Sequence, residues 1–196
     1  MTDSIEAIHQ YWFGDLDEYG MADASRNKLW FQSTPEDDER CRALFGELVE
    51  TALEGGLSEW ESSDRGVIAL ILLLDQFTRT FFRGDARAFA GDARALALAQ
   101  HQIAHGHHQR MPAAHQVFLF LPLEHSEDLD LQEECVELFA ELEAITGMEA
   151  MAGYSRFAVA HRDVIARFGR FPHRNAVLGR ESTPEEQAHM NTHGGF

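Results

Sequence analysis

Several residue types and patterns are scarce in this chain of 196 residues, and each scarcity excludes a class of protein. Two cysteines are too few for a disulfide-stapled secreted scaffold, so we expect Cys41 and Cys135 to be buried thiols. The first residues contain no basic segment followed by an apolar run, so no secretory signal is predicted. The longest apolar run, residues 67–74, has eight residues, whereas a membrane-spanning helix needs about 20. We therefore expect a cytoplasmic protein that does not enter a membrane.

Positive charge is also scarce, and lysine occurs only once. The formal net charge is −17, from 33 acidic and 16 basic residues, and such a surface repels the phosphate backbone of nucleic acids. No glycine-rich phosphate loop, dinucleotide-binding fingerprint, GxSxG nucleophile motif or CxxC pair occurs. We expect no nucleic-acid partner, and the sequence does not identify a cofactor.

Apolar residues recur at helical spacing along nearly the whole chain, and no stretch alternates with the period of a β-strand. This pattern predicts one all-α domain over residues 1–196, built from seven or more helices as stacked antiparallel hairpins, with a frayed end at 191–196. Residues 67–74 are apolar on every side, which predicts the most buried helix.

Capping residues, prolines and glycines mark the expected ends of these helices. Predicted starts are Thr34-Pro35, Asp64, Asp92, Pro112, Ser126 and Thr183-Pro184, and predicted ends are Gly14, Gly55-Gly56, Gly106, Pro122, Gly147 and Gly169.

The first group with chemical potential directly follows the apolar run and consists of Asp75, Gln76 and Arg79. Asp75 and Arg79 are four residues apart, so they can pair on one helix face. Because an unpaired charge is costly at the end of a buried helix, we expect the Asp75 carboxylate to be engaged by an arginine. The pair is either a structural contact between helices or the floor of a polar, ligand-binding cleft.

Two histidines are candidate catalytic residues. His125 stands beside an expected helix start and close to the carboxylates of Glu124 and Glu127, which could orient it and tune its pKa. His161 interrupts an apolar helix face, where it is either a core histidine or a base in a site. Glu127 is the third catalytic candidate.

Residues 156–180 contain six arginines and one acid, a local charge of +5 that leaves −22 for the rest of the chain. The planar guanidinium group suits carboxylate and phosphate ligands. We interpret this segment as a pocket for an anionic group; the alternative is that its arginines pair with nearby acids and fix an irregular segment. The ligand-binding candidates of this segment are Arg170, His173, Arg174 and Asn175.

A second group of histidines lies at positions 101, 105, 107, 108 and 115. Histidines four apart on a helix can chelate a metal, but no acid or cysteine joins them, so we predict no metal site.

These residues also carry a resemblance to a known family. The chain resembles the bacterial family called domain of unknown function 924 through blocks spread almost end to end: residues 11–14, Trp30-Phe31, residues 73–77, Arg79, residues 82–84, 121–127, His161, 167–175, 178–180 and Ser182-Thr183. Thr78 departs from the family, which usually has proline there. The resemblance implies a tetratricopeptide-repeat-like stack of helical hairpins and no known activity.

Two functions remain as predictions. In the first, the candidates above converge on one cleft that binds a small anionic ligand, in an enzyme or a binding protein. In the second, the chain is a scaffold for a protein partner, the usual work of tetratricopeptide-like stacks. A ligand site gathers its distinctive residues in one place, whereas a scaffold spreads them over a helix face.

Overall fold

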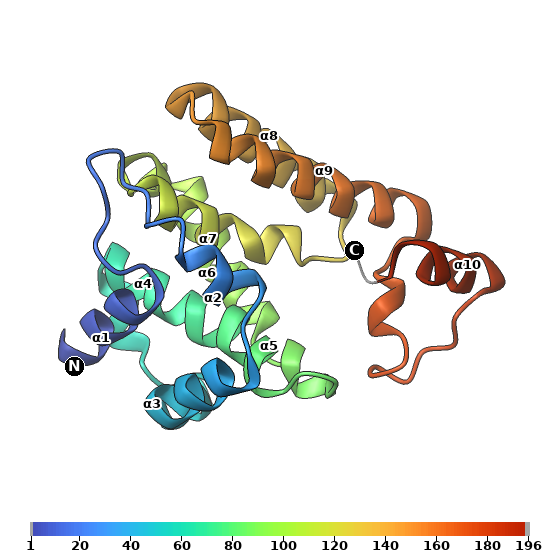
Figure 1. Ribbon diagram of the computed structural model, residues 1–196, viewed down its shortest axis with the longest axis horizontal. Coiled ribbons are helices and arrows are strands. Elements are labelled where there is room, and N and C mark those ends of the chain that lie inside the picture. Colours follow the sequence, from blue (N-terminus) through green and yellow to red (C-terminus); the bar gives the residue numbers. More distant parts are fainter. Residues whose placement is uncertain (1, 195–196) are drawn as a thin grey trace. The chain divides into compact units, whose positions relative to one another are not determined.

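The computed structural model describes residues 2–194, and within them the chain is helical and has no β-strand, so the predicted all-α fold is confirmed. The α-helices are α1 (Thr2–Trp12), α2 (Arg26–Phe31), α3 (Pro35–Leu53), α4 (Asp64–Ile71), α5 (Thr78–Phe81), α6 (Asp92–Ala104), α7 (Ala113–Glu124), α8 (Leu129–Thr146), α9 (Glu149–Phe168) and α10 (Pro184–His193) (Figure 1). Short turns of 3-10 helix are η1 (Ser58–Ser62), η3 (Ala86–Phe89), η4 (His107–Arg110) and η5 (Pro172–Arg174), and η2 (Leu72–Phe77) is a π-helix.

The chain divides into two compact units. Unit 1 comprises Met1–Arg83 and Arg87–Pro122, and unit 2 comprises Gly84–Ala86 and Leu123–Phe196. The prediction of a single domain and the tetratricopeptide-like stacking of hairpins stay predictions. Of the end expected to fray, 191–193 belong to α10, and residues 195 and 196 lie outside the described part of the chain.

The core of unit 1 is the apolar run predicted to be most buried. Every side chain of residues 67–74 is at most 1% exposed, and α1, α3 and α6 pack around this helical segment. Aromatic side chains extend the core, with Trp12 and Phe77 in edge-to-face contact at 5.3 Å between ring centroids. Burial of these side chains from water is the main stabilisation of the unit.

The π-helix η2 continues α4 directly and leads into α5. Its wider winding makes i→i+5 hydrogen bonds, a geometry often found at functional sites. The hydroxyl of Thr78 donates to the carbonyl oxygens of Leu74 (2.8 Å) and Asp75 (3.3 Å), so a side chain supplies partners for this buried backbone.

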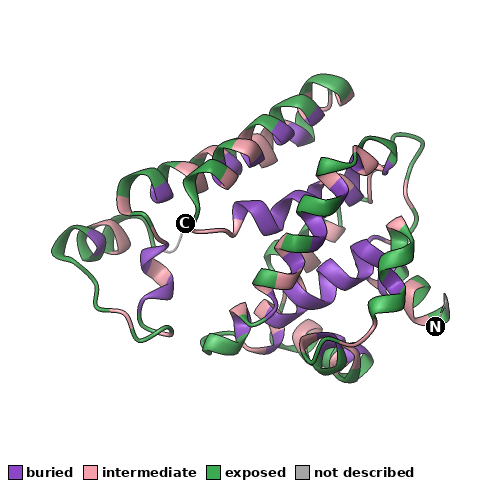
Figure 2. Cartoon of the chain, turned by 180° about the vertical axis from the view of Figure 1, so that it is seen from behind, coloured by how far each residue is buried: buried purple, intermediate pink, exposed green. Residues whose placement is uncertain are grey.

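Unit 2 is built on a hairpin of two long helices, α8 and α9, which lie side by side (Figure 1). Gly147 ends α8 in the left-handed conformation, with φ of 62°, and a connection of two residues leads into α9. The facing sides of the two helices are buried and their outer sides are exposed (Figure 2). The buried side chains include Cys135, Leu138, Phe139 and Leu142 of α8 and Met151, Ala158, Val164 and Ile165 of α9.

Several predicted helix ends are confirmed. Thr34 and Thr183 both form capping boxes, in which the threonine hydroxyl accepts from a backbone N–H three residues on and that residue's carboxylate accepts the threonine N–H. Gly169 follows α9 with φ of 67°. The local sequence is enough to predict these helix starts, because the two residues of each capping box lie within one helical turn.

Three predicted ends are wrong. Pro122 lies inside α7 instead of closing it; its ring removes one backbone donor, but residues 118–123 are all buried, and their packing outweighs that loss. Ser63 caps α4 where Asp64 was predicted, and Asp128 caps α8 where Ser126 was predicted. In both places a polar residue one or two positions from the predicted one makes the capping hydrogen bond.

Both cysteines are buried free thiols, as predicted. None of the helices within residues 2–194 combines the length and the apolar character that crossing a membrane requires.

Candidate functional site

The candidate site lies in unit 2, where the chain leaves α7. Gln132 of α8 is fully buried, and its side-chain amide donates to the carbonyl oxygens of Glu124 (2.6 Å) and Ser126 (2.7 Å). Glu124 ends α7 and Ser126 lies just beyond it, where no following helical turn supplies donors to the carbonyl oxygens. Gln132 thus fixes the backbone on both sides of His125.

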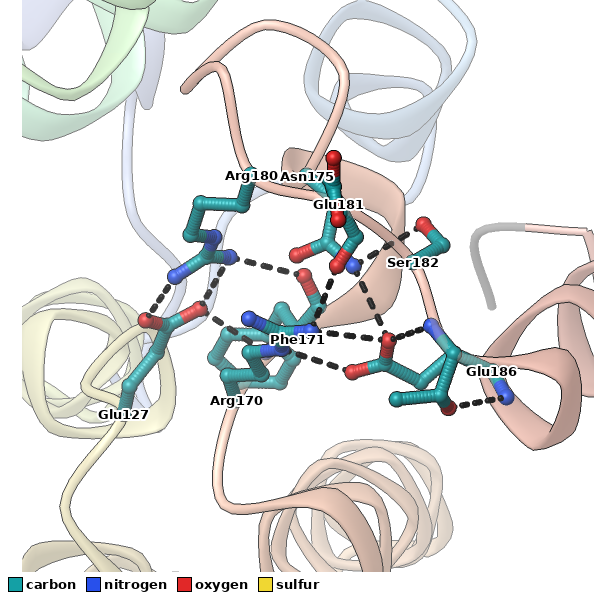
Figure 3. A network of polar contacts seen from close by, with 9 residues as sticks. Glu127, Arg170, Phe171, Asn175, Arg180, Glu181, Ser182 and Glu186 are labelled. Carbon is teal, nitrogen blue, oxygen red and sulfur yellow. Dashed lines mark hydrogen bonds and ion pairs between the residues drawn. The ribbon is translucent and has the colours of Figure 1, made fainter.

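Glu127 and Arg180 hold the backbone of Phe171 between them (Figure 3). One carboxylate oxygen of Glu127 accepts the Phe171 N–H at 2.8 Å, and both oxygens accept from the Arg180 guanidinium at 2.6 and 2.9 Å. Arg180 also donates to the Phe171 carbonyl oxygen at 3.1 Å. Burial by itself would raise the pKa of Glu127, but the hydrogen bonds from Arg180 and Phe171 lower it below its usual value. Glu127 is therefore an ionised structural anchor.

Arg170 is held by Glu186 of α10 in a fork of two hydrogen bonds, 2.6 and 2.9 Å long (Figure 3). Only 3% of the Glu186 side chain is exposed, and it also accepts from the Thr183 N–H and the Asn175 amide. The hydrogen bond from Arg170 is the main cause that lowers the pKa of Glu186 to about 2. The alternative reading of the basic segment, internal pairing with acids, therefore holds for Arg170 and Arg180.

Three other residues of the segment, Arg174, His161 and His173, gather around the ring of Phe171, which is fully buried. The Arg174 guanidinium carbon lies 4.5 Å from the centre of this ring, and the ring centres of His161 and His173 lie 5.7 and 5.6 Å from it. The ring centre of His125 lies 6.4 Å from that of His161. The structure thus brings together four residues that we call the cationic cluster: His125, His161, His173 and Arg174.

His161 is the member of the cationic cluster with the best-defined hydrogen bonding. Its Nδ1 lies 2.8 Å from the Phe157 carbonyl oxygen and 3.4 Å from a carboxylate oxygen of Glu124. Because a carbonyl oxygen only accepts, Nδ1 carries the proton and Nε2 of the neutral ring keeps its lone pair. Burial lowers the pKa of His161 to about 3; the Phe157 carbonyl opposes this, and the nearby positive charge of the cluster adds to it. His161 is therefore neutral at neutral pH, and the Phe157 carbonyl fixes the orientation of its ring.

Asp75, Gln76 and Arg79 belong to unit 1 and form a network of their own there. The buried Asp75 carboxylate is 3.0 Å from Arg79 Nη1, so the predicted pairing is confirmed, and its other oxygen accepts from the Gln76 amide at 2.5 Å. Arg79 also makes a fork to Asp92, with distances of 2.8 and 3.0 Å. The convergence of this group with the histidines of unit 2 stays a prediction.

The second group of histidines does not stay together, and His108 is buried with its ring centre 6.0 Å from that of Phe120. The rings of His101, His105 and His107 lie 4.3 to 6.4 Å apart by their centroids, at the end of α6. His115 is buried beside His9, with 4.8 Å between their ring centres. No three His, Cys, Asp or Glu side chains within residues 2–194 are arranged to hold a metal ion.

Sequence reasoning missed two residues of the site. Phe171 was not a candidate, although its ring is the common contact of three cluster members and its backbone is held by Glu127 and Arg180. Glu186 was read only as part of a capping box, and it also binds Arg170. A signal existed for Phe171, because an aromatic residue in a segment of many charges is expected to be buried. No local signal identified Glu186 as the partner, since 16 residues separate it from Arg170.

Comparisons with other proteins agree with this helical architecture. A family model, described as bacterial protein of unknown function (DUF924), matches residues 8–194. A protein of unknown function from Agrobacterium tumefaciens has a solved structure that superposes with a TM-score of 0.83; it is 32% identical, and the match covers 97% of this chain and 98% of that one. No curated protein sequence matches the chain.

Proposed function

The chain belongs to the DUF924 family of bacterial proteins of unknown function, and we propose from its own side chains that it binds a small anionic ligand at the cationic cluster. One observation carries this proposal: His161, His173 and the buried Arg174 gather around the Phe171 ring in unit 2, and His125 lies beside His161. The Arg174 guanidinium carries a positive charge, which would attract a bound anion at short range.

The surroundings of the cluster favour recognition because they are rigid. The salt bridges of Glu127 with Arg180 and of Arg170 with Glu186 fix the segment on both sides of His173 and Arg174. Fixed donors lose little conformational entropy when a ligand binds, which increases affinity. The guanidinium of Arg174 is suited to two parallel hydrogen bonds with a carboxylate or a phosphate.

The net charge of the chain opposes the binding of an anion. At −17, the protein repels anions at long range, so electrostatic steering does not help the ligand to arrive. Affinity must then come from short-range contacts in the cluster. We therefore expect binding that depends on the shape of the anion as well as on its charge.

Thermal unfolding with sulfate, inorganic phosphate and citrate tests the proposal, because a ligand that binds only the folded protein raises the melting temperature. We expect one of these anions to raise Tm in a saturable way, and Arg174→Gln to abolish the shift. Arg156→Gln is the matched control, since Arg156 is an exposed arginine of the same unit on α9. If Arg174→Gln does not fold, as judged by circular dichroism, His173→Gln replaces it. No shift with any of the three anions, or equal shifts in the Arg174 or His173 variant and in the control, would overturn the proposal.

A tetratricopeptide-like stack that binds a protein partner is the second candidate. Exposed apolar side chains on the α8–α9 hairpin favour it, namely Ile145, which is 82% exposed, and Phe157, which is 60% exposed. Neither belongs to the cationic cluster. Replacing Ile145 by serine would therefore weaken a protein contact and leave anion binding unchanged, which separates the two candidates.

A further inference from the structure

The end of α6 carries two histidines whose rings lie close together. The ring centres of His101 and His105 are 4.3 Å apart, and both side chains are exposed. His105 directly follows the helix, and its backbone N–H donates to the His101 carbonyl oxygen at 3.3 Å, so the two residues are one helical turn apart. A metal ion lies about 2.0–2.1 Å from each ligating nitrogen, so two imidazole rings bound to one ion have their centres roughly 4–5 Å apart. The observed separation therefore suits a shared metal ion.

A hydrogen bond orients one of the two rings. The Nδ1 atom of His105 lies 2.8 Å from the His101 carbonyl oxygen. Because a carbonyl oxygen only accepts, Nδ1 carries the proton and Nε2 carries the lone pair that binds a metal. Metal-ligating histidines commonly donate their other N–H to a carbonyl group, which fixes the ring and makes the ligating nitrogen more basic. Within residues 2–194, no hydrogen bond occupies His105 Nε2 or either ring nitrogen of His101.

The electrostatic surroundings of this pair favour a cation. The backbone dipoles of a helix add up to a partial negative charge at its C-terminal end, where both histidines lie. The net charge of −17 also attracts cations at long range. The charge that opposes an anion at the cationic cluster therefore helps a metal ion to arrive at α6.

We propose that His101 and His105 together bind one divalent ion of the late transition metals, Ni²⁺, Cu²⁺ or Zn²⁺, with one imidazole nitrogen each, and that water completes the coordination. The pair belongs to unit 1, so this inference is independent of the proposed function. It departs from the sequence-based prediction of no metal site, which requires an acid or a cysteine as a further ligand. Two neutral imidazoles are a sufficient chelate, and no third His, Cys, Asp or Glu side chain within residues 2–194 is arranged to join them.

The type of ligand decides which ions fit. Imidazole nitrogen suits copper, nickel and zinc, and the affinity of such ligands generally rises from Ni²⁺ to Cu²⁺ and falls again at Zn²⁺. Mg²⁺ and Ca²⁺ prefer oxygen ligands, which this pair does not offer. We therefore expect Cu²⁺ to bind most tightly and Mg²⁺ not to compete.

The chain offers a matched control, because α10 carries a second pair at the same spacing. The ring centres of His189 and His193 lie 4.8 Å apart. The His189 ring packs against Phe168, with 5.1 Å between ring centres, and its Nδ1 is buried. Within the described residues, no carbonyl oxygen accepts from either ring, so this pair lacks the hydrogen bond that orients His105. A site created by spacing alone would form at both pairs, whereas a site that needs an oriented ring forms only on α6.

Calorimetric titration of the full chain, prepared without a histidine tag and treated with a chelator, tests the inference with Ni²⁺ as the probe. We expect saturable binding of one ion per chain. His101→Gln and His105→Gln should each weaken this binding by about tenfold or more, because only one imidazole remains. His193→Gln should leave it unchanged. All three side chains are exposed, and circular dichroism checks that the variants are folded.

The absence of Ni²⁺ binding would overturn the inference. An unchanged affinity in either α6 variant, or an equal loss in His193→Gln, would do the same. A large excess of Mg²⁺ should not reduce Ni²⁺ binding; if it does, oxygen ligands hold the ion and the assignment to His101 and His105 is wrong. None of these results affects the thermal shifts expected with anions, so the two proposals are decided separately.

Discussion

The carboxylate of Glu127 binds the guanidinium of Arg180, 53 residues further along the chain, through two hydrogen bonds of 2.6 and 2.9 Å. The same two side chains hold the N–H and the carbonyl group of Phe171. This contact joins the segment after α7 to the segment after α9. It places the Phe171 ring, and so the cationic cluster, at a fixed position within unit 2.

Breaking this contact should destabilise unit 2. We expect Glu127→Gln and Arg180→Gln each to lower the free energy of unfolding by about 1–3 kcal/mol, the usual range for hydrogen bonds to charged groups. Urea unfolding measures both values. Because the partners share one interaction, the double variant should cost less than the sum of the two single variants. Strictly additive effects would contradict the pairing.

The buried carboxylate of Asp75 should matter more for stability than an exposed one. Asp75→Ala leaves Arg79 without one of its two acidic partners in a buried environment, and we expect a loss of about 2–4 kcal/mol. Glu50→Ala is the matched control, because Glu50 pairs with Arg87 with both side chains 51% exposed. Such a surface pair contributes about 0–1 kcal/mol. Equal losses in the two variants would show that the burial of Asp75 has no energetic effect.

Gly91 precedes α6 and lies against Leu74 of the π-helix η2. A Cβ atom at this position would stand 2.2 Å from the carbonyl oxygen of Leu74, a distance that real contacts do not reach. We expect Gly91→Ala to lower the free energy of unfolding by about 1–3 kcal/mol, because the backbone must move. Gly153→Ala is the control: it lies inside α9 with no atom within 4 Å of the added group, so it should stabilise by about 0.5–1 kcal/mol. Chemical denaturation would reveal the opposite signs.

Two buried histidines of unit 1 should make stability depend on pH. Burial lowers the pKa of His9 to about 4, the Arg65 carbonyl and Glu6 oppose this, and the charge of Arg65 adds to it. Burial also lowers the pKa of His115 to about 3, and the charges of His9 and Arg65 act in the same direction. Their ordinary value in the unfolded chain is about 6.5. Between pH 6.5 and 4, the unfolded chain therefore binds protons that the folded chain excludes. The free energy of unfolding falls as the pH falls, by about 1.4 kcal/mol per pH unit for each such histidine.

The variant His9→Gln tests this origin of the pH dependence. Its amide can still donate to the Arg65 carbonyl, which accepts from His9 Nε2 at 2.8 Å, but it does not titrate. Urea unfolding between pH 6.5 and 4.5 should show a smaller slope than in the wild-type protein, by about 1.4 kcal/mol per pH unit. Glu186, whose pKa is about 2, loses its stabilising charge only at lower pH, so it does not contribute to the slope between pH 6.5 and 4.5. An unchanged slope would mean that His9 is not kept neutral by the fold.

The sequence by itself determined the features that depend on residues a few positions apart. The apolar run at 67–74 required a buried helix, and the threonine, proline and acid around Thr34 and Thr183 required two helix starts. The spacing of Asp75 and Arg79 required their pairing, because residues four apart on a helix are neighbours whatever the rest of the chain does. The same holds for the left-handed glycine after α9.

Only the tertiary structure decided which charged residues bind one another over long distances. Arg170, Arg174 and Arg180 look equivalent in the sequence, yet two of them are held by Glu186 and Glu127, and Arg174 lies over the Phe171 ring. Packing also kept Pro122 inside α7 and formed the π-helical turn. The physical reason is that a guanidinium group pairs with whichever carboxylate the packed helices bring within about 3 Å, and the sequence gives no measure of that distance before the core has formed.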